Sequence, residues 1–187
     1  MKKIAWKPGT VMAPLPALLV TCGPMERPNA MTAGWTGILC SDPPITYVSI
    51  QPIRYSHGLV SERGVFVLNL TTEDLAFAVD FCGVKSGRDM DKLAHLGLTV
   101  ERGPNTDCPM LVESPVNIEC RVRQVQQLGT HDFFMADIVG VHVAEALIDE
   151  GGRFAMERAG LITYAHGQYQ ALGRSLGRFG YTVRKKK

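Results

Sequence analysis

Apolar and polar residues alternate along much of the first half of this chain, as they do in half-buried β-strands. A short helix is expected after the apolar run at residues 45–50, with Ser56 as its N-cap and Gly64 at its end. The strands follow one another without the regular strand–helix alternation of a parallel sheet. Turn-forming residues separate four apolar runs, at residues 17–22, 35–39, 45–50 and 65–70.

A long antiparallel hairpin is predicted in the second half of the chain. Residues 116–125 alternate, residues 126–129 turn the chain, and residues 132–144 run back. One face of the first arm is apolar: Val116, Ile118, Cys120, Val122 and Val125. The other face is polar: Asn117, Glu119, Arg121 and Arg123.

The segments between these strands are assigned less regular structure. A helix is expected to open at Thr71 and Thr72, and residues 81–92 are expected to form a loop leading into a helix that ends at Leu96. Only residues 98–100 look extended in this region. The glycine-rich stretch 160–180 is expected to be an extended tail lying on a surface.

These elements predict a mainly β, antiparallel fold with inserted helices, closed as a barrel so that few strand edges are exposed. The chain has 187 residues, of which 45% are hydrophobic, so it can bury a full core. No linker or repeat divides it. We therefore expect a single domain over residues 1–187 with a core of about 14–180, and a solvated, frayed tail at 184–187.

Charge and cysteine content narrow the class of protein. The net charge of +2 leaves no basic face for nucleic acid. No window reaches the roughly 18 apolar residues of a membrane span, and no apolar signal core follows Met1. The five cysteines are widely spaced, without metal-binding motifs, and are expected to be reduced and mostly buried. These features indicate a soluble cytoplasmic protein.

The segment 29–39 is unusual because it carries more small residues and hydroxyls than a packed strand needs. Glycine allows a ligand to approach the backbone closely, and Thr32 and Thr36 offer hydroxyl groups. A flat ligand that bears a phosphate would suit such a strand. No dinucleotide-binding glycine motif and no P-loop is present, so a phosphate would need another cradle.

Arg54 and Ser56 could form that cradle at a helix start, where free N–H groups attract anions and a guanidinium can bind two phosphate oxygens. The alternative is that Ser56 only caps the helix and Arg54 is solvated. Residues 85–88 with Lys92 are a second cluster of donors, or simply a surface loop. His131 could contact a ligand or finish a turn. The sequence contains neither the Gly-x-Ser-x-Gly motif of serine hydrolases nor a pattern of metal-ligating residues.

The motifs taken together resemble the flavoredoxin branch of the flavin reductase-like family, over about residues 14–180. These proteins have an FMN-binding split β-barrel and typically form homodimers. The resemblance rests on segments that occur in order: Asn29-x-Met-Thr-Ala-Gly-Trp-Thr-Gly, Arg54-x-Ser56, Phe66-Val-Leu-Asn69, Cys82-Gly-x-x-Ser-Gly-Arg-Asp-x-Asp-Lys92, Glu119-Cys120 and Gly129-Thr-His-Asp132.

The resemblance implies FMN as a noncovalent cofactor. Its phosphate would be held by Arg54 and Ser56, its ribityl chain would pass Asn69, and His131 with the 164–172 segment would lie near the flavin or the dimer contact. The implied FMN-binding residues are Asn29, Met31, Thr32, Ala33, Gly34, Trp35, Thr36, Arg54, Ser56, Asn69, Ser86, Arg88, Lys92 and His131. No metal site is expected.

The family also implies the chemistry, because the flavin carries the electrons and no acid–base pair of side chains is required. The first reading is an enzyme, an NAD(P)H-dependent flavin or ferric-complex reductase. The alternative is a non-enzymatic FMN electron carrier that exchanges electrons with redox proteins. A third reading, in which the fold has lost flavin, is disfavoured because the phosphate donors are all present. The sequence leaves the electron donor and acceptor open.

Overall fold

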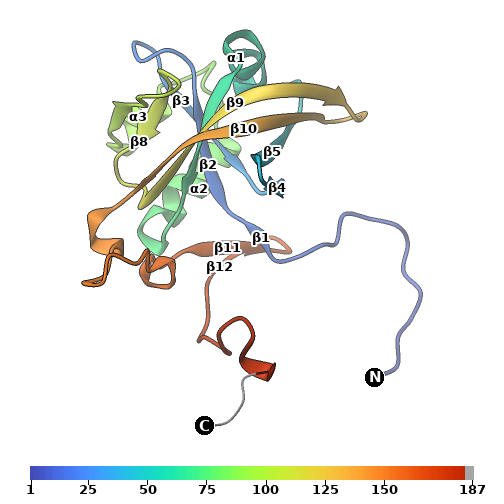
Figure 1. The fold of residues 1–187 in the computed structure, drawn as a ribbon. Coiled ribbons are helices and arrows are strands. Elements are labelled where there is room, and N and C mark those ends of the chain that lie inside the picture. The colour runs from blue at the N-terminus through green and yellow to red at the C-terminus, as the bar shows by residue number, and fades with distance from the viewer. Residues whose placement is uncertain (184–187) are drawn as a thin grey trace.

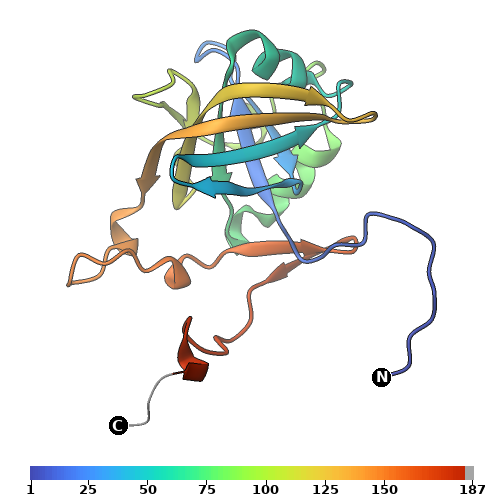
Figure 2. The ribbon, with the colours of Figure 1, turned by 45° about the vertical axis from the view of Figure 1, so that its right-hand side comes forward.

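The computed structural model describes residues 1–183, and the tail expected at 184–187 lies outside the described residues. Its centre is a seven-stranded antiparallel sheet in the order β3-β2-β6-β9-β10-β5-β4 (Figure 1). The two edge strands, β3 and β4, are consecutive in the chain and only two residues apart, so the sheet curls into a barrel (Figure 2). The strands are β2 (Leu18–Cys22), β3 (Asn29–Ala33), β4 (Thr36–Ser41), β5 (Pro44–Ile50), β6 (Val65–Leu70), β9 (Val116–Gln127) and β10 (Asp132–Val143).

Smaller elements surround this barrel. A three-stranded sheet, β1-β11-β12, lies below it in Figures 1 and 2, and β7 pairs with β8. The remaining strands are β1 (Leu15–Pro16), β7 (Val100–Arg102), β8 (Pro109–Leu111), β11 (Ile162–Ala165) and β12 (Gln168–Ala171). The helices are α1 (Tyr55–Arg63), α2 (Ala76–Val84), α3 (Lys92–Leu96) and four 3-10 turns, η1 (Glu73–Leu75), η2 (Glu145–Leu147), η3 (Met156–Arg158) and η4 (Tyr181–Val183).

The sheet is packed on both faces, which explains why its central strands are apolar along their whole length. All five residues of β2 are buried. On one face Phe66 and Phe134 fill the barrel interior, and each is 0% exposed. On the other face Leu19 packs against α2 and α3. Truncating either phenylalanine to Ala would cost about 3–5 kcal/mol, the usual loss for a large core aromatic.

The predicted fold class is confirmed: the protein is mainly antiparallel β with few helices. The strand predicted at 65–70 is β6, and the long hairpin is β9–β10. The five cysteines are free and four are buried. A single domain over residues 1–187 stays a prediction.

Several local expectations were wrong. The segment 29–39 is not one strand but β3 and the start of β4, separated at Gly34 and Trp35. Ser56 does not cap α1, because Arg54 occupies the N-cap and Ser56 lies buried in the first turn. Residues 81–84 continue α2 instead of starting a loop, since Val79 and Cys82 bury that helix against the sheet. The stretch 162–171 forms a hairpin.

The polar face expected on the hairpin arm is also partly wrong. Glu119 is 0% exposed, because the loop before β8 folds over this side of β9. Its carboxylate accepts hydrogen bonds from the side chains of Asn105 (2.6 Å) and Thr106 (2.6 Å) and is paired with His142 Nε2 (2.7 Å). Burial opposes ionisation, but the hydrogen bonds from Thr106, Asn105 and His142 lower the pKa of Glu119 to about 2.

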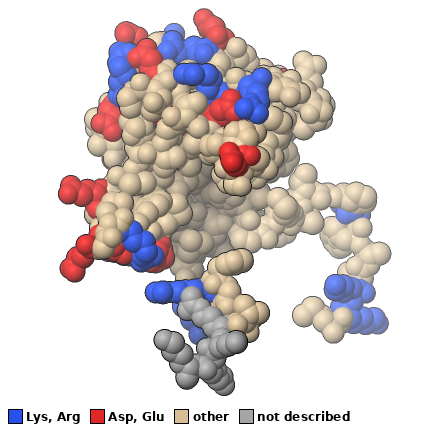
Figure 3. Space-filling view, in the orientation of Figure 1, with Lys and Arg blue, Asp and Glu red and all other residues tan. Residues whose placement is uncertain are grey.

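Residues 1–14 carry no helix or strand and extend away from the barrel (Figures 1 and 2). Charges of both signs intermix over the end of the molecule that carries α1 and α3, as Figure 3 shows. Among the described residues, no helix combines the length and the apolar composition needed to cross a membrane.

Candidate functional site

Two adjoining cavities lie where β3, the start of α1 and the end of α2 meet. The first, which we name the cationic cavity, has a volume of about 280 Å³. Four of its lining side chains are basic and none is acidic, so it favours an anion. Its basic residues are Arg54, Lys85, Arg88 and Lys92, and its other lining residues are Asn29, Met31, Gln51, Ile53, Tyr55, Ser56, Cys82, Val84, Ser86 and Gly87.

The basic groups of this cavity are held in place by backbone carbonyls. The Arg54 guanidinium donates to the Gly83 carbonyl (2.9 Å), and the Arg88 guanidinium donates to the Ile53 carbonyl (3.1 Å). A guanidinium has five N–H donors, so each arginine keeps donors for a ligand. The bonds therefore orient the charges without consuming them.

Lys92 contributes a buried charge, since it is only 4% exposed. Its amine donates to the carbonyls of Cys82 (3.4 Å) and Lys85 (3.1 Å), which leaves one of its three donors. Burial lowers the pKa of the Lys92 amine because a charged group loses its hydration there. An anion bound beside it would offset that loss.

The thiols nearby stay neutral. Burial raises the pKa of Cys22 to about 11 and also raises the pKa of Cys82. A neutral thiol adds no negative charge, so the cavity keeps its positive character at neutral pH.

A hydrogen bond across the floor of the cavity joins β3 to α1. Asn29 Nδ2 donates to Ser56 Oγ (2.7 Å), and the Ser56 hydroxyl in turn lies within hydrogen-bonding reach of the Cys22 thiol. The Arg54 side chain does not cap α1, although the His57 N–H donates to the Arg54 carbonyl (3.0 Å). Gly87 packs directly on Asn29 and Tyr55, and a β-carbon there would overlap the Asn29 amide.

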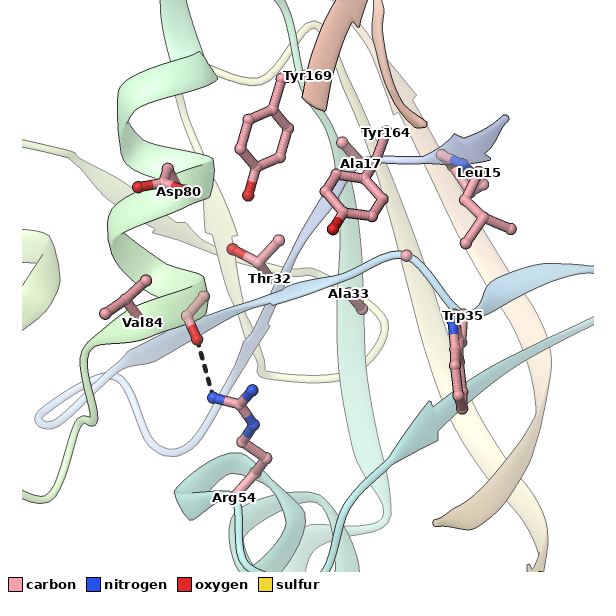
Figure 4. Close-up of a pocket in the computed structure, with 13 residues that line it drawn as sticks. Leu15, Ala17, Thr32, Ala33, Trp35, Arg54, Asp80, Val84, Tyr164 and Tyr169 are labelled. Atoms are coloured by element: carbon pink, nitrogen blue, oxygen red, sulfur yellow. Dashed lines mark hydrogen bonds between the residues drawn. The ribbon is translucent and has the colours of Figure 1, made fainter. Parts of the chain in front are cut away.

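The second cavity, which we name the ring cavity, has a volume of about 300 Å³ and shares Arg54 and Val84 with the first. Figure 4 shows the Arg54 guanidinium in this cavity, with its hydrogen bond to the Gly83 carbonyl as a dashed line. One wall is the β3–β4 segment, and the opposite wall carries Tyr164 and Tyr169. The lining residues are Leu15, Pro16, Ala17, Thr32, Ala33, Gly34, Trp35, Arg54, Asp80, Gly83, Val84, Tyr164 and Tyr169.

The structure brings together most of the residues implied as a flavin site. The cationic cavity collects Asn29, Met31, Arg54, Ser56, Ser86, Arg88 and Lys92, and the ring cavity collects Thr32, Ala33, Gly34 and Trp35. His131 lines neither cavity. The His131 ring lies against the Trp35 ring at a tilt of 33°, with ring centroids 4.5 Å apart. The neighbouring Asp132 pairs with His57 Nε2 (2.8 Å) and so ties β10 to α1.

Asn69 and Thr36 line neither cavity, and their contact with a ligand stays a prediction. Asn69 is 0% exposed and its amide bonds backbone groups of Leu19 and Leu111. The Thr36 hydroxyl donates to the Tyr47 carbonyl, and the Thr32 hydroxyl donates to the Val79 carbonyl. The hydroxyls of segment 29–39 therefore mainly serve the fold, because each stands opposite an accepting carbonyl.

Sequence reasoning missed Asp80 on the wall of the ring cavity and did not distinguish Tyr164 and Tyr169 within their segment. A hairpin signal was present, since His166-Gly167 separates two short runs that each contain a tyrosine. Only the fold, however, places this hairpin against α2. In the described part of the chain, no group of three or more metal-ligating side chains is present.

Known proteins with similar sequences support a single family. The family model described as "Flavin reductase like domain" matches residues 11–173. An uncharacterized protein of Archaeoglobus fulgidus is 35% identical over 136 residues, which are 73% of this chain and 76% of that protein.

Solved structures agree with this over nearly the whole chain. The flavoredoxin of Desulfovibrio vulgaris (Miyazaki F) has a TM-score of 0.88 and 30% identity, covering 98% of this chain and 100% of its own. An FMN-binding protein from Thermus thermophilus, with bound 1-cyclohex-2-enone, has a TM-score of 0.79 and 29% identity, covering 95% of this chain and 98% of its own.

Proposed function

Because this chain belongs to the flavin reductase-like family, we propose that it binds FMN noncovalently and transfers electrons through it. The observation that carries the proposal is the pair of adjoining cavities that share Arg54. One cavity is lined by four basic side chains and suits a phosphate, while the other is lined by aromatic and small residues and suits a flat ring. FMN has these two parts at its two ends.

The residues fit the phosphate end of FMN in kind and in number. Arg54, Arg88 and Lys92 retain donors, and the Ser56 hydroxyl and the α1 N-terminus add neutral ones. Charge-assisted hydrogen bonds of this type are the strong ones. The ring would lie against the backbone of Ala33 and Gly34, where small side chains allow close approach.

When bound, FMN supplies the redox chemistry, and the protein supplies binding, orientation and control of water. We propose that the electrons come from NAD(P)H and pass to free flavin, a ferric complex or a redox protein. The FMN-binding protein from Thermus thermophilus was solved with bound 1-cyclohex-2-enone, which supports a site that also admits a small organic molecule.

The first experiment is a titration of the purified chain with FMN, followed by visible absorbance and flavin fluorescence. The proposal requires saturable binding at one FMN per chain. A chain that is colourless once the excess FMN has been removed, and that gives no saturable signal, would rule the proposal out.

The second experiment separates an enzyme from an electron carrier. The FMN-loaded protein is mixed anaerobically with NADH or NADPH in a stopped-flow instrument. Bleaching of the flavin at a rate that matches turnover supports a reductase. FMN that NAD(P)H does not bleach, but that a redox protein reduces, would indicate a carrier instead.

We also propose that the chain forms a homodimer. An apolar groove of about 490 Å³ lies beside the ring cavity, lined by Thr10, Met12, Leu15, Trp35, Leu39, Tyr47, Ser49, Leu128 and Phe133. Leu39 is 45% and Leu128 is 56% exposed, which leaves apolar area for a second copy to cover. Analytical ultracentrifugation of the purified chain should show a dimer. The variant Leu128→Lys should weaken the association of the two copies. A monomer at all concentrations would contradict this assembly.

A further inference from the structure

Two tyrosines stand side by side on the wall of the ring cavity. Tyr164 on β11 and Tyr169 on β12 are directly paired across the hairpin, and their ring centroids are 5.4 Å apart. Figure 4 shows both hydroxyl groups pointing into the cavity, toward the β3 segment that carries Thr32. The pair therefore presents two phenol groups to whatever fills the cavity.

The position of this pair is fixed from behind. Both rings pack on the core cluster around α2 and β2, and β11 pairs with β1 through Leu15 and Pro16. The Thr163 hydroxyl donates to the Leu15 carbonyl (2.6 Å), which further anchors the hairpin. The rings are thus held by apolar packing, while their hydroxyls remain at the cavity. Among the described residues, Tyr164 has no hydrogen-bond partner for its hydroxyl.

The ring cavity mixes hydrogen-bonding and apolar groups. Tyr164 and Tyr169 offer O–H donors, Asp80 offers a carboxylate, and Leu15, Val84 and Trp35 offer apolar surface. An isoalloxazine ring has carbonyl oxygens on one edge and methyl groups on the opposite edge. Pairing the phenol donors with acceptors would place the carbonyl edge of the ring at the tyrosines.

We propose that Tyr164 and Tyr169 donate hydrogen bonds to the carbonyl edge of the flavin ring and thereby favour the reduced form of the cofactor. This inference rests on the proposed function and adds a role for the β11–β12 hairpin. Reduction adds electron density to that edge, and a hydrogen bond to a more negative acceptor is stronger. The donors therefore bind reduced FMN more tightly than oxidised FMN, which raises the midpoint potential by linkage.

Tyr169 stays a donor at neutral pH. Burial raises the pKa of its phenol, and the charge of Asp80 and a hydrogen bond from the phenol to the Asp80 carboxylate raise it further. A protonated phenol is what the proposed hydrogen bond needs.

The test replaces both hydroxyls while keeping both rings, in the variant Y164F/Y169F of the full chain. The midpoint potential of bound FMN is measured by anaerobic reductive titration against a reference dye. We expect the affinity for reduced FMN, relative to oxidised FMN, to fall about tenfold, which corresponds to about 30 mV for a two-electron couple. The visible bands of the bound flavin should shift as well.

Tyr181→Phe is the matched control, because Tyr181 is 59% exposed and lines neither cavity. The single variants Tyr164→Phe and Tyr169→Phe carry the test if the double variant does not fold. A merely structural role would lower stability without moving the potential. A variant that binds FMN with the potential of the control would overturn this inference and leave the proposed function standing. A wild-type chain that takes up no FMN would overturn both.

Discussion

Arg54 is the residue on which the proposed FMN site depends most, since it lines both cavities. Its guanidinium donates to the Gly83 carbonyl at 2.9 Å and keeps further N–H donors for a phosphate. Replacing it with Ala removes the donor at the junction of the two cavities and leaves the packing of the sheet unchanged, because the side chain is exposed.

A hydrogen bond to a charged group contributes about 1.5–3 kcal/mol. Arg54→Ala should therefore weaken FMN binding by about 10- to 150-fold, with RT at about 0.6 kcal/mol. The lower half of this range is expected, because Arg54 is exposed and Arg88 and Lys92 remain to hold the phosphate. Arg54→Lys should recover part of the loss, since it keeps the charge but not the planar fork of donors.

The assay is a fluorescence titration of FMN at fixed ionic strength, because charge–phosphate contacts are screened by salt. Arg123→Ala is a suitable control: Arg123 pairs with Asp137 on the β9–β10 hairpin (2.7 Å), and neither residue lines the cationic or ring cavity. If Arg54→Ala binds FMN as tightly as this control, Arg54 is not a phosphate ligand and the placement of the phosphate in the cationic cavity is wrong.

Three other outcomes are expected. Gly87→Ala should weaken FMN binding about tenfold or more, measured by the same titration, because its β-carbon would displace Asn29 from Ser56. The pKa of Glu119 is lowered to about 2 in the folded chain, so its ionised carboxylate contributes about 3 kcal/mol to the free energy of unfolding above pH 4.5. That contribution is lost as the pH falls toward 2. In denaturant unfolding at several pH values, Glu119→Gln should lose this pH dependence of the free energy of unfolding. A variant whose stability falls between pH 4.5 and 2 as steeply as that of the wild type would contradict the prediction. FMN at 100 times its Kd should stabilise the folded chain by about 2.7 kcal/mol, because it binds the folded state only. Calorimetry should therefore show a Tm that is higher by about 5–10 °C. Equal melting with and without FMN would argue against binding to the folded chain.

Local patterns in the sequence carried much of the fold. The run at 65–70 is buried on both faces, so apolar β-formers fill it and its bounds could be read directly. Gly64 ends α1 in the left-handed conformation, with φ at 66°, as glycine at a helix C-terminus commonly does. The hairpin β9–β10 followed from alternation around a turn.

Other features depended on residues far apart in the chain. Glu119 looked like a solvent-facing residue, because strand alternation does not reveal that residues 105 and 106 fold over it. The N-cap of α1 could not be predicted from Ser56 alone, because the Ser56 hydroxyl accepts a hydrogen bond from Asn29 of β3, which is distant in the chain. The motif that contains Asn69 does not reveal that its amide bonds backbone groups of Leu19 and Leu111 within the core.

By itself, the sequence determined an antiparallel barrel and the set of residue types that can hold a phosphate and a flat ring. It did so because strand alternation, glycine and the clustered basic residues are local signals. Only the tertiary structure decided that residues 29–35, 54–56 and 85–92 line two joined cavities, and that the hairpin with Tyr164 and Tyr169 closes one wall. Those contacts join segments far apart in the chain, such as residues 29–35 and 164–169, and burial between them has no signature in any one segment.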